Sequence, residues 1–197
     1  MFIDPSALTT YKKNYPNSQI EIFEKKPHDI LSDVLTEKSV FGITVFTDEL
    51  VASHPELEFE TILEEGTVLC ASKNSPLAYL ENLQDEDLAN QSIILFEDPI
   101  WSGFVNELFD YVPNMNILFT TNNVNVISEA VSEGLGIVFS MNLLLSKVAA
   151  IQNGSVITRP FKHPSQQRFS FGIVRLKRKK LSEHSKQFIK AFKQNII

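Results

Sequence analysis

Residues 120–141 read Thr-Thr-Asn-Asn-Val-Asn-Val-Ile-Ser-Glu-Ala-Val-Ser-Glu-Gly-Leu-Gly-Ile-Val-Phe-Ser-Met, and this stretch decides the fold. Asn122 or Asn123 can cap a helix here, because a short polar side chain accepts a hydrogen bond from an unpaired backbone N–H of the first turn. Apolar residues then recur at helical spacing and form one face: Val124, Ile127, Ala130 and Val131. The pattern predicts an amphipathic helix.

The residues after this helix predict a tight turn into a buried strand. Gly134 stands where a helix commonly ends in a left-handed residue, a conformation that costs glycine least. After Gly136, Ile137-Val138-Phe139 is continuously apolar, as in a strand buried on both faces. We therefore expect a helix-to-strand step of a parallel sheet.

Composition indicates an ordinary globular protein. The 197 residues are enough for one large or two small lobes, with 43% hydrophobic and 21% charged residues. No run approaches the roughly 18 apolar residues of a membrane helix, and no secretory signal is visible. One cysteine excludes an internal disulfide and fits a reducing compartment. The net charge of −6 argues against a broad phosphate-backbone contact. We expect a soluble, cytoplasmic chain that does not itself contact DNA.

Strands and helices alternate over most of the chain. Asp4-Pro5 opens a helix that Pro16 stops, and an alternating strand is predicted over residues 19–23. Further helices are predicted over 28–36, 102–112, 143–149 and from Ser182, and further strands over 41–46, 58–63, 67–71, 92–96, 116–119, 156–157 and 169–174, with a turn at 164–167. This order predicts mainly parallel sheets layered by helices. No flexible linker divides the chain, which suggests two lobes joined by strands.

Several sequence motifs occur in an order that resembles their order in one known family. A helix ends at Tyr15-Pro16, and a strand occupies Phe41-Gly42-Ile43-Thr44-Val45. Val68-Leu69-Cys70 and Asn74-Ser75-Pro76-Leu77-Ala78 follow, then Gly134-Leu135-Gly136-Ile137 and a closing helix from Leu181-Ser182 to Phe188. Over nearly its whole length the chain resembles the effector-binding domain of LysR-type transcriptional regulators. It departs from that family by lacking the usual acidic residue at 41–45 and by having Ser75 where histidine is common.

The resemblance implies an α/β fold of the type 2 periplasmic binding protein class. Lobe I would comprise residues 1–66 plus 171–197 and lobe II residues 67–170, with crossovers near 66–71 and 169–171 and a ligand cleft between the lobes. The family's winged helix-turn-helix and most of its first effector-domain strand are not in this sequence. The sheet of lobe I would then be incomplete unless Phe2-Ile3 or another chain supplies the edge.

Ligands of such sheets bind outside the carboxyl ends of the strands, near helix N-termini. This rule selects as ligand-binding candidates Lys25, Lys26, Thr47, Phe96, Glu97, Pro99, Trp101, Ser102, Thr121, Asn122, Asn123 and Ser140, with Glu24, Phe46, Asp98 and Met141 beside them. Some have simpler interpretations. Lys25-Lys26 can be solvated turn residues; Ser102 and one of the asparagines can be helix caps. Trp101 can line a pocket or a dimer contact.

The sequence offers no coherent catalytic or metal site. Glu97-Asp98 is a carboxylate pair, but adjacent carboxylates in one loop rarely point at a common centre. The four histidines lack metal-ligand spacing, and Cys70 lies in an apolar strand as a small core residue. No phosphate-binding loop or nucleophile-elbow motif is present. We expect no enzyme activity, no cofactor and no metal.

The resemblance implies a small-molecule sensing domain that signals to DNA-binding domains not present in this chain. It also implies a homodimer through contacts of lobe I with lobe II, and a possible tetramer in the full-length regulator. The apolar stripes of helices 28–36 and 102–112 are the candidates for that contact. Two alternatives remain: a stand-alone solute-binding protein of the same fold, and a small α/β enzyme.

Overall fold

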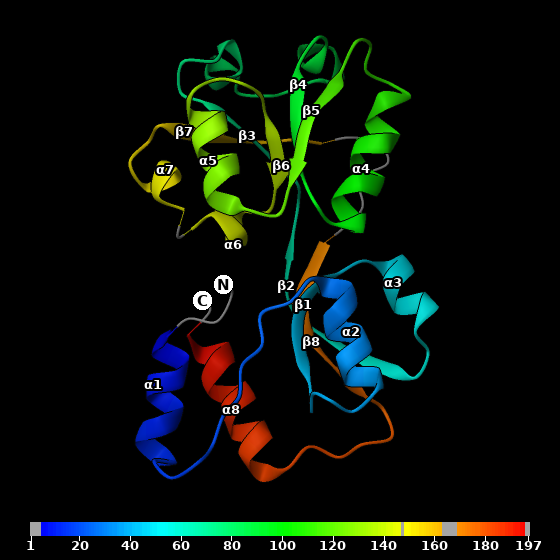
Figure 1. The fold of residues 1–197 in the computed structure, drawn as a ribbon, viewed down its shortest axis with the longest axis vertical. Helices are drawn as coiled ribbons and strands as arrows, with labels where there is room; N and C mark the ends of the chain where they lie inside the picture. The colour runs from blue at the N-terminus through cyan, green and yellow to red at the C-terminus, as the bar shows by residue number, and fades with distance from the viewer. Residues whose placement is uncertain (1–4, 147, 163–168, 196–197) are drawn as a thin grey trace. The chain divides into compact units, whose positions relative to one another are not determined.

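The computed structural model describes residues 5–146, 148–162 and 169–195. They fall into two compact units, drawn in Figure 1. Unit 1 is Met1–Glu64 with Ser170–Ile197, and unit 2 is Glu65–Phe169. None of the described helices combines the length and the apolar character needed to cross a membrane.

Unit 1 is built on a three-stranded sheet of order β1-β8-β2. Its strands are β1 (Gly42–Phe46), β2 (Leu57–Glu65) and β8 (Phe169–Leu176), and its helices are α1 (Pro5–Asn14), α2 (Pro27–Leu35), α3 (Asp48–Ser53) and α8 (Glu183–Gln194). β1 pairs antiparallel with β8, with Thr44 opposite Gly172. Among the described strands, only one edge of β1 has a partner.

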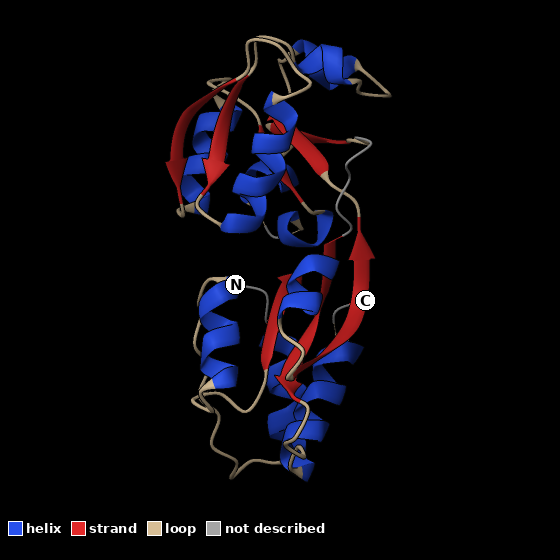
Figure 2. Cartoon of the chain, turned by 90° about the vertical axis from the view of Figure 1, so that its right-hand side faces the viewer, coloured by secondary structure: helices blue, strands red, loops and turns tan. Residues whose placement is uncertain are grey.

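Helices cover both faces of this sheet, as Figure 2 shows. On one face, Leu31 and Val34 of α2 pack against Leu57, Val174 and Leu176 in an almost solvent-free cluster. On the other face, Phe192 of α8 lies 6.3 Å from Phe171, ring centre to ring centre. α1 packs on α8, where the rings of Tyr11 and Phe188 meet edge to face at 5.5 Å. Alternate residues of β8 therefore serve opposite faces, as strand geometry requires.

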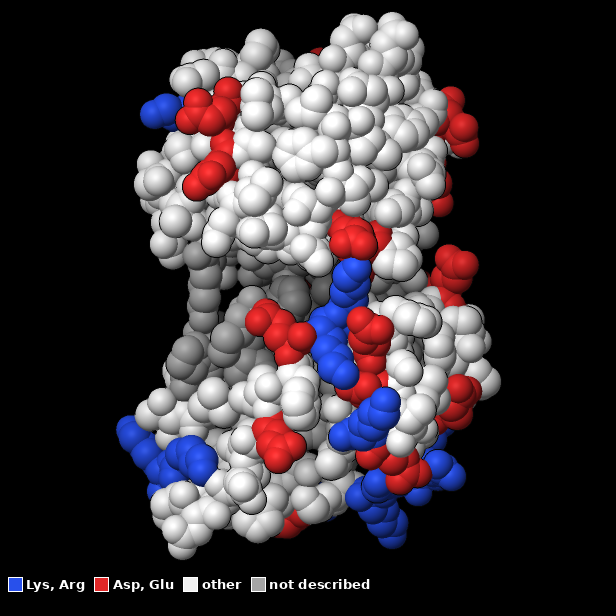
Figure 3. All heavy atoms as spheres, in the orientation of Figure 1, with Lys and Arg blue, Asp and Glu red and all other residues white. Residues whose placement is uncertain are grey.

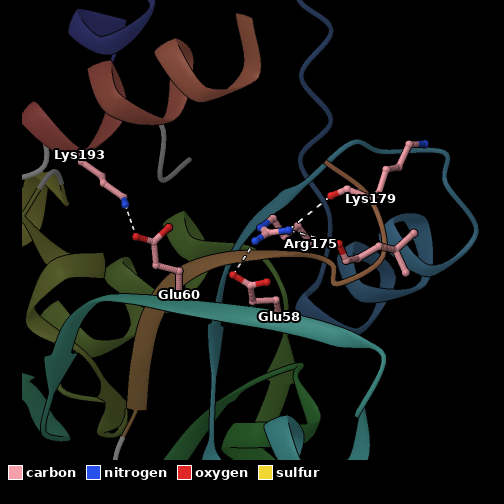
Figure 4. Close-up of polar contacts among 6 residues, drawn as sticks. Glu58, Glu60, Arg175, Lys179 and Lys193 are labelled. Carbon is pink, nitrogen blue, oxygen red and sulfur yellow. Dashed lines mark hydrogen bonds and ion pairs between the residues drawn. The ribbon is translucent and has the colours of Figure 1, made fainter. Parts of the chain in front are cut away.

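Ion pairs join elements of unit 1 that are far apart in sequence (Figure 4). Arg175 of β8 donates to Glu58 of β2 at 2.6 Å, and Lys193 of α8 pairs with Glu60. Arg178 and Lys179 both pair with Glu37, each at 2.7 Å. These side chains are partly exposed, so the pairs orient the elements more than they stabilise them.

The described residues of unit 2 form the strands β3 (Val68–Ser72), β4 (Ser92–Phe96), β5 (Asn116–Thr121), β6 (Val138–Ser140) and β7 (Val156–Pro160). Its helices are α4 (Pro99–Phe109), α5 (Val124–Ser132), α6 (Asn142–Leu145) and α7 (Ala149–Gln152), with short 3₁₀ turns at Pro76–Tyr79 and Asp85–Leu88. β6 and β7 flank β3, both antiparallel to it. β4 and β5 form a parallel pair.

The two sheets of unit 2 adjoin at Ile137. A parallel bridge links Ile93 to Ile137, and the backbone N–H of Ile94 donates to the Ile137 carbonyl at 2.8 Å. Ile127, Ala130 and Val131 of α5 pack on one face, against Val68, Cys70, Ile94, Val138 and Val156. α4 packs on the other face through Phe104, whose ring lies edge to face with that of Phe139 at 5.1 Å between ring centres. Successive residues Val138 and Phe139 thus bury into opposite layers.

The predicted helix, turn and strand over residues 124–140 are confirmed. α5 ends in a Schellman arrangement, in which the Leu135 N–H donates to Ala130 and the Gly134 N–H to Val131, with Gly134 at φ +76°. A Cβ on Gly136 would lie 2.6 Å from the Ser92 carbonyl oxygen, so the second glycine admits close contact with β4. The final helix also begins as predicted, with Ser182 accepting from the Ser185 N–H.

Two predictions about the sheets are wrong. Residues 19–23 form no strand, because no backbone hydrogen bond joins them to another described residue and alternation alone cannot make a ladder. The sheets are not mainly parallel: among described residues, parallel pairing is limited to β4–β5 and two isolated bridges. β8 is antiparallel to β1. The chain leaves unit 1 through β2 and returns to it through β8.

Several helix predictions also need correction. α3 follows β1 in a segment for which no helix is predicted, and the helix predicted over 143–149 is two short helices, α6 and α7. The helix predicted from Ser102 begins three residues earlier, at Pro99. The predicted turn at 164–167 lies outside the described residues.

The apolar stripes proposed for dimer contact are largely used inside their own units. Leu31 and Val34 of α2 are 1% and 0% exposed, and Phe104 and Leu108 of α4 are both 0% exposed. Amphipathic helices on a sheet bury their apolar face against that sheet first. Ile30, Leu35 and Phe109 of the same stripes are half-buried.

Candidate functional site

The carboxyl ends of three strands lie along one edge of unit 2. β4 and β5 are paired in parallel with Phe96 opposite Thr121, and the Glu97 N–H donates to the Thr121 carbonyl at 3.0 Å. β6 continues from Ile137, which bridges β4 in the same parallel sense. The chain leaves these strands at Glu97, Asn122 and Met141, so the loops that follow share one edge of the unit.

Helix α4 begins at this edge with Asp98 as its cap. The Asp98 side chain accepts from the Ile100 N–H at 2.9 Å, and Pro99 occupies the first turn, where its missing N–H costs nothing. Asp98 is only 5% exposed, whereas Glu97 is exposed. Ser102 is therefore not the cap that the sequence suggested: its own N–H donates to the Asp98 carbonyl, and its side chain is half-buried one turn into the helix.

Helix α5 begins at the same edge and is capped by Asn123. The Asn123 carboxamide oxygen accepts from the N–H groups of Asn125 at 3.0 Å and Val126 at 3.3 Å. The Thr121 hydroxyl accepts from the Asn123 N–H at 3.2 Å, which fixes the loop between strand and helix. Asn122 lies between Thr121 and Asn123 and is exposed. Its side chain therefore faces the solvent, whereas that of Asn123 caps the helix.

The loop after β6 is held by a carboxylate from a distant strand. Glu65, at the end of β2, accepts from the Leu143 N–H in the first turn of α6 at 2.9 Å. Ser140, the last residue of β6, is half-buried, and Met141 is fully buried. Sequence reasoning missed Glu65, because no local pattern indicates a cap that comes from 78 residues away.

Trp101 is a core residue of unit 2. It is 7% exposed, its ring lies 4.9 Å from that of Phe169, and Phe104 meets it edge to face at 6.2 Å. Its indole closes the aromatic layer beneath the start of α4.

The candidates from unit 1 lie where α2 and α3 begin. Thr47 caps α3 by accepting from the Leu50 N–H at 3.3 Å and is 7% exposed, while Lys26 directly precedes Pro27 of α2. Lys25 is exposed and lies in the segment before α2; its ammonium is 2.6 Å from the Asp33 carboxylate, which is largely buried in α2. In Figure 3, charged side chains of both signs gather near α2 and are sparse over the middle of unit 2.

The strand-end edge of unit 2 therefore offers hydrogen-bonding groups rather than a reactive centre. Around it lie the exposed Glu97, Pro99, Asn122 and Asn123 and the half-exposed Phe96, Thr121 and Ser140. Burial raises the pKa of the Cys70 thiol to about 12, so this thiol stays protonated at neutral pH and makes a poor nucleophile. Among the described residues, no group of three His, Cys, Asp or Glu side chains is placed to hold a metal ion.

A hollow of about 620 Å³ occurs elsewhere, within unit 1. It lies between residues 19–25 and β1, and Lys25 is the one predicted contact residue along its described lining. Residues 19–25 and 38–43 line it with both apolar and charged side chains, and Tyr11, Phe188 and His184 contribute to the lining.

Comparison with known proteins identifies the family. The sequence model of the LysR substrate binding domain matches residues 4–196. A probable RuBisCO transcriptional regulator of Thalassiosira pseudonana is 25% identical over 80% of this chain and 53% of its own length. An uncharacterized HTH-type transcriptional regulator, YvbU of Bacillus subtilis (strain 168), is 20% identical over 96% of this chain and 62% of its own length. The chain thus spans between half and two thirds of these relatives.

Solved structures share the fold. The regulatory domain of Synechocystis PCC6803 CcmR in complex with 2-PG has a TM-score of 0.78 at 18% identity, covering 96% of this chain and 89% of that one. The effector binding domain of QuiR in complex with shikimate has a TM-score of 0.73 at 20% identity, covering 98% and 91%. With its fold of two α/β units and a family match over residues 4–196, this chain belongs to the LysR substrate-binding domain family, the effector-binding domain of LysR-type transcriptional regulators.

Proposed function

We propose that this chain binds a small polar metabolite at the carboxyl ends of β4, β5 and β6, and that binding is transmitted to DNA-binding domains of the regulator. The observation that carries the proposal is the parallel register of Phe96 with Thr121. It brings the loop after β4 and the loop after β5 to one edge, where α4 and α5 both begin. Strand ends that face helix N-termini are the usual ligand-binding edge of α/β units.

The contacts proposed in unit 2 are the exposed or half-exposed polar groups of that edge. Thr121, Asn122 and Ser140 provide hydroxyl and carboxamide groups, which can both donate and accept hydrogen bonds. Glu97 adds a carboxylate, which selects ligands that present donors at that point. Lys26 and Thr47, at the helix starts of unit 1, are a second set of candidate contacts.

Regulation requires more than affinity. A ligand shifts a conformational equilibrium only by its difference in affinity for the two states, so the effector must bind one arrangement of the regulator better than the other. The family supports a regulatory role rather than an enzymatic one, and the named relatives are transcriptional regulators. We also propose a homodimer, with α2 and α4 as the candidate contact helices. Sedimentation equilibrium that shows only monomer at high concentration would contradict this dimer.

A thermal-shift screen tests the binding proposal. Shikimate and 2-PG are rational first probes, because related domains were solved in complex with them. A ligand at about 100 times its Kd stabilises the folded state by roughly 2.7 kcal/mol, which is readily seen as a rise in Tm.

Substitutions locate the site of any compound that binds. Asn122→Ala and Thr121→Ala are expected to weaken binding at least about tenfold, the effect of losing roughly 1.4 kcal/mol. Matched controls are Asn106→Ala, an exposed asparagine within α4, and Thr120→Ala, the exposed neighbour of Thr121 on β5. Equal affinity for both site variants and both controls would remove this edge as the binding site.

A further inference from the structure

We propose that unit 2 holds a positively charged, hydrogen-bond-donating group of the effector, an ammonium or a guanidinium, rather than a carboxylate or a phosphate. This proposal rests on the binding site proposed above, at the carboxyl ends of β4, β5 and β6. At that edge the protein's own acceptors cap the helices, the surface side chains can accept hydrogen bonds, and the loops contain no cationic residue.

The two long helices that begin at this edge are capped by oxygens of the protein itself. Helix N-termini bind anions through backbone N–H groups that have no partner within the helix. At α4, the Ile100 N–H donates to the Asp98 carboxylate at 2.9 Å, and Pro99 has no N–H to offer. At α5, the Asn123 carboxamide oxygen accepts from two N–H groups of the first turn. An anion would have to displace these caps.

The loop backbone at the edge also donates to the protein. The Glu97 N–H donates to the Thr121 carbonyl, and the Asn123 N–H donates to the Thr121 hydroxyl. The short helix α6, which follows β6, is capped by the Glu65 carboxylate, which accepts from the Leu143 N–H at 2.9 Å. Two of the three helix caps at this edge are thus carboxylates, and a carboxylate repels an anionic ligand.

The polar side chains at the surface of the edge suit a donor. Glu97 and Asn122 are exposed and Thr121 and Ser140 are half-buried, and their carboxylate, carboxamide and hydroxyl oxygens all accept hydrogen bonds. The Thr67 hydroxyl, directly before β3 where β3 pairs with the end of β6, is 2% exposed and has no hydrogen-bond partner among the described residues. An ammonium has three donors and no acceptor, so it matches such a set better than a carboxylate does.

The loops that leave the edge contribute negative charge. Residues 96–103, 121–127 and 140–146 include Glu97 and Asp98 but no Lys, Arg or His. A concave surface lined by one sign of charge attracts ligand groups of the opposite sign and repels those of the same sign. These loops therefore favour a cationic group of the effector.

The cations of unit 2 that the structure describes lie away from these loops. Lys73 follows the end of β3, and the start of β3 pairs with the end of β6, so Lys73 stands at the opposite end of the sheet. Lys162 follows β7, which lies on the far side of β3 from β6. Arg159 of β7 donates to the main-chain carbonyls of Ala78 and Leu80. None of these three side chains stands at the ends of β4 and β5.

Spin probes of three charges test the proposal before the effector is known. The isotope-labelled full chain is mixed in turn with aminomethyl-, carbamoyl- and carboxy-PROXYL, which share one nitroxide ring and carry a positive, no and a negative charge. NMR measures the paramagnetic relaxation enhancement of the amide protons in residues 97–103 and 121–127. We expect the enhancement by the cationic probe to exceed that by the anionic probe at least about threefold, because the ratio reports the local potential.

Charge variants locate the origin of this ratio. Glu97→Gln should lower the ratio and Asn122→Asp should raise it. Glu133→Gln, which changes an exposed glutamate at the other end of α5, is the matched control and should leave the ratio unchanged. A ratio of one or below in the unsubstituted protein would overturn the proposal, as would equal ratios in Glu97→Gln and Glu133→Gln.

Ligand binding separates failure of this proposal from failure of the proposed site. The diamine putrescine supports both if it raises Tm, slows amide exchange in residues 97–103 and 121–127, and binds Glu97→Gln at least about tenfold more weakly. If shikimate, a carboxylate, protects the same residues and binds Glu97→Gln at least as tightly as the unsubstituted protein, the site stands and the charge assignment is overturned. Protection by either compound only outside these residues overturns the site and, with it, this proposal.

Discussion

The carboxamide oxygen of Asn123 accepts a hydrogen bond from the backbone N–H of Asn125 at 3.0 Å, and this contact starts α5 at the proposed ligand-binding edge. The same oxygen also receives the Val126 N–H. Two N–H groups that would otherwise face the solvent are thus satisfied by the protein itself. Asn123 therefore has a structural role at this edge, and the exposed Asn122 remains available to a ligand.

Asn123→Ala should lower the free energy of unfolding by about 1 kcal/mol, because it removes the cap of α5. Asn122→Ala is the matched control and should change stability by only a few tenths of a kcal/mol. Urea denaturation followed by circular dichroism measures both. Equal losses for the two variants would mean that the cap contributes nothing specific.

Three glycine-to-alanine substitutions separate backbone strain from steric contact. Gly134→Ala should cost about 1 kcal/mol, because residue 134 has φ +76°. Gly136→Ala should cost more, since its Cβ would lie 2.6 Å from the Ser92 carbonyl and β4 would have to move.

Gly103→Ala is the control for both substitutions. It lies within α4 with no neighbouring atom within 4 Å of the added Cβ, and it should stabilise the protein by roughly 0.5–1 kcal/mol. The predicted order of Tm is therefore Gly103→Ala, wild type, Gly134→Ala, Gly136→Ala. Any other order contradicts the assigned causes.

Cys70 should make stability fall at alkaline pH. Burial raises the pKa of its thiol to about 12, whereas the unfolded thiol titrates near 9, so above pH 9 the unfolded state holds fewer protons. The free energy of unfolding then decreases as pH rises, by up to about 1.4 kcal/mol per pH unit from this group, until the folded pKa is reached. Denaturation of wild type and Cys70→Ala at pH 7–10 should show a steeper decline in the wild type. Parallel declines would exclude the thiol as the cause.

Glu37 should make the free energy of unfolding decrease at acidic pH, whereas Cys70 does so at alkaline pH. A hydrogen bond from Lys179, with the charges of Lys179 and Arg178, holds the pKa of this exposed carboxyl below its usual value of 4.5. A depressed folded pKa adds stability that is present above about pH 4.5 and is lost as pH falls through the folded pKa. Glu37→Gln should flatten the acid limb of a stability–pH curve slightly, and 1 M NaCl should reduce the difference. A larger difference at high salt would contradict an ion-pair origin.

Local signals in the sequence predicted local structure well. Asn123, Gly134 and the run Ile137–Phe139 each act through neighbours within one turn or one strand, so the helix, its cap and the following strand could be located. A local signal for α4 is also present in the sequence: Asp98-Pro99 has the same Asp-Pro pattern as Asp4-Pro5, and Asp98 rather than Ser102 is the cap of α4.

Long-range relationships could not be predicted in this way. The alternation of residues 19–23 is that of a strand, but a strand exists only with a partner backbone beside it. Trp101 is buried by Phe169, and α6 is capped by Glu65, and both contacts depend on the tertiary fold. Among the predicted ligand contacts, the structure brings the unit 2 residues after β4, β5 and β6 to one edge.

Hydrogen exchange of the full chain, with and without a compound that raises its Tm, shows whether the effector binds at the ends of β4 and β5. We predict slower exchange in residues 97–103 and 121–127, the loops and first helical turns after β4 and β5. Exchange at residues 19–25 and 38–43, the walls of the unit 1 hollow, should be unchanged. Protection confined to those walls, with none at the ends of β4 and β5, would contradict the assignment of the effector site to unit 2.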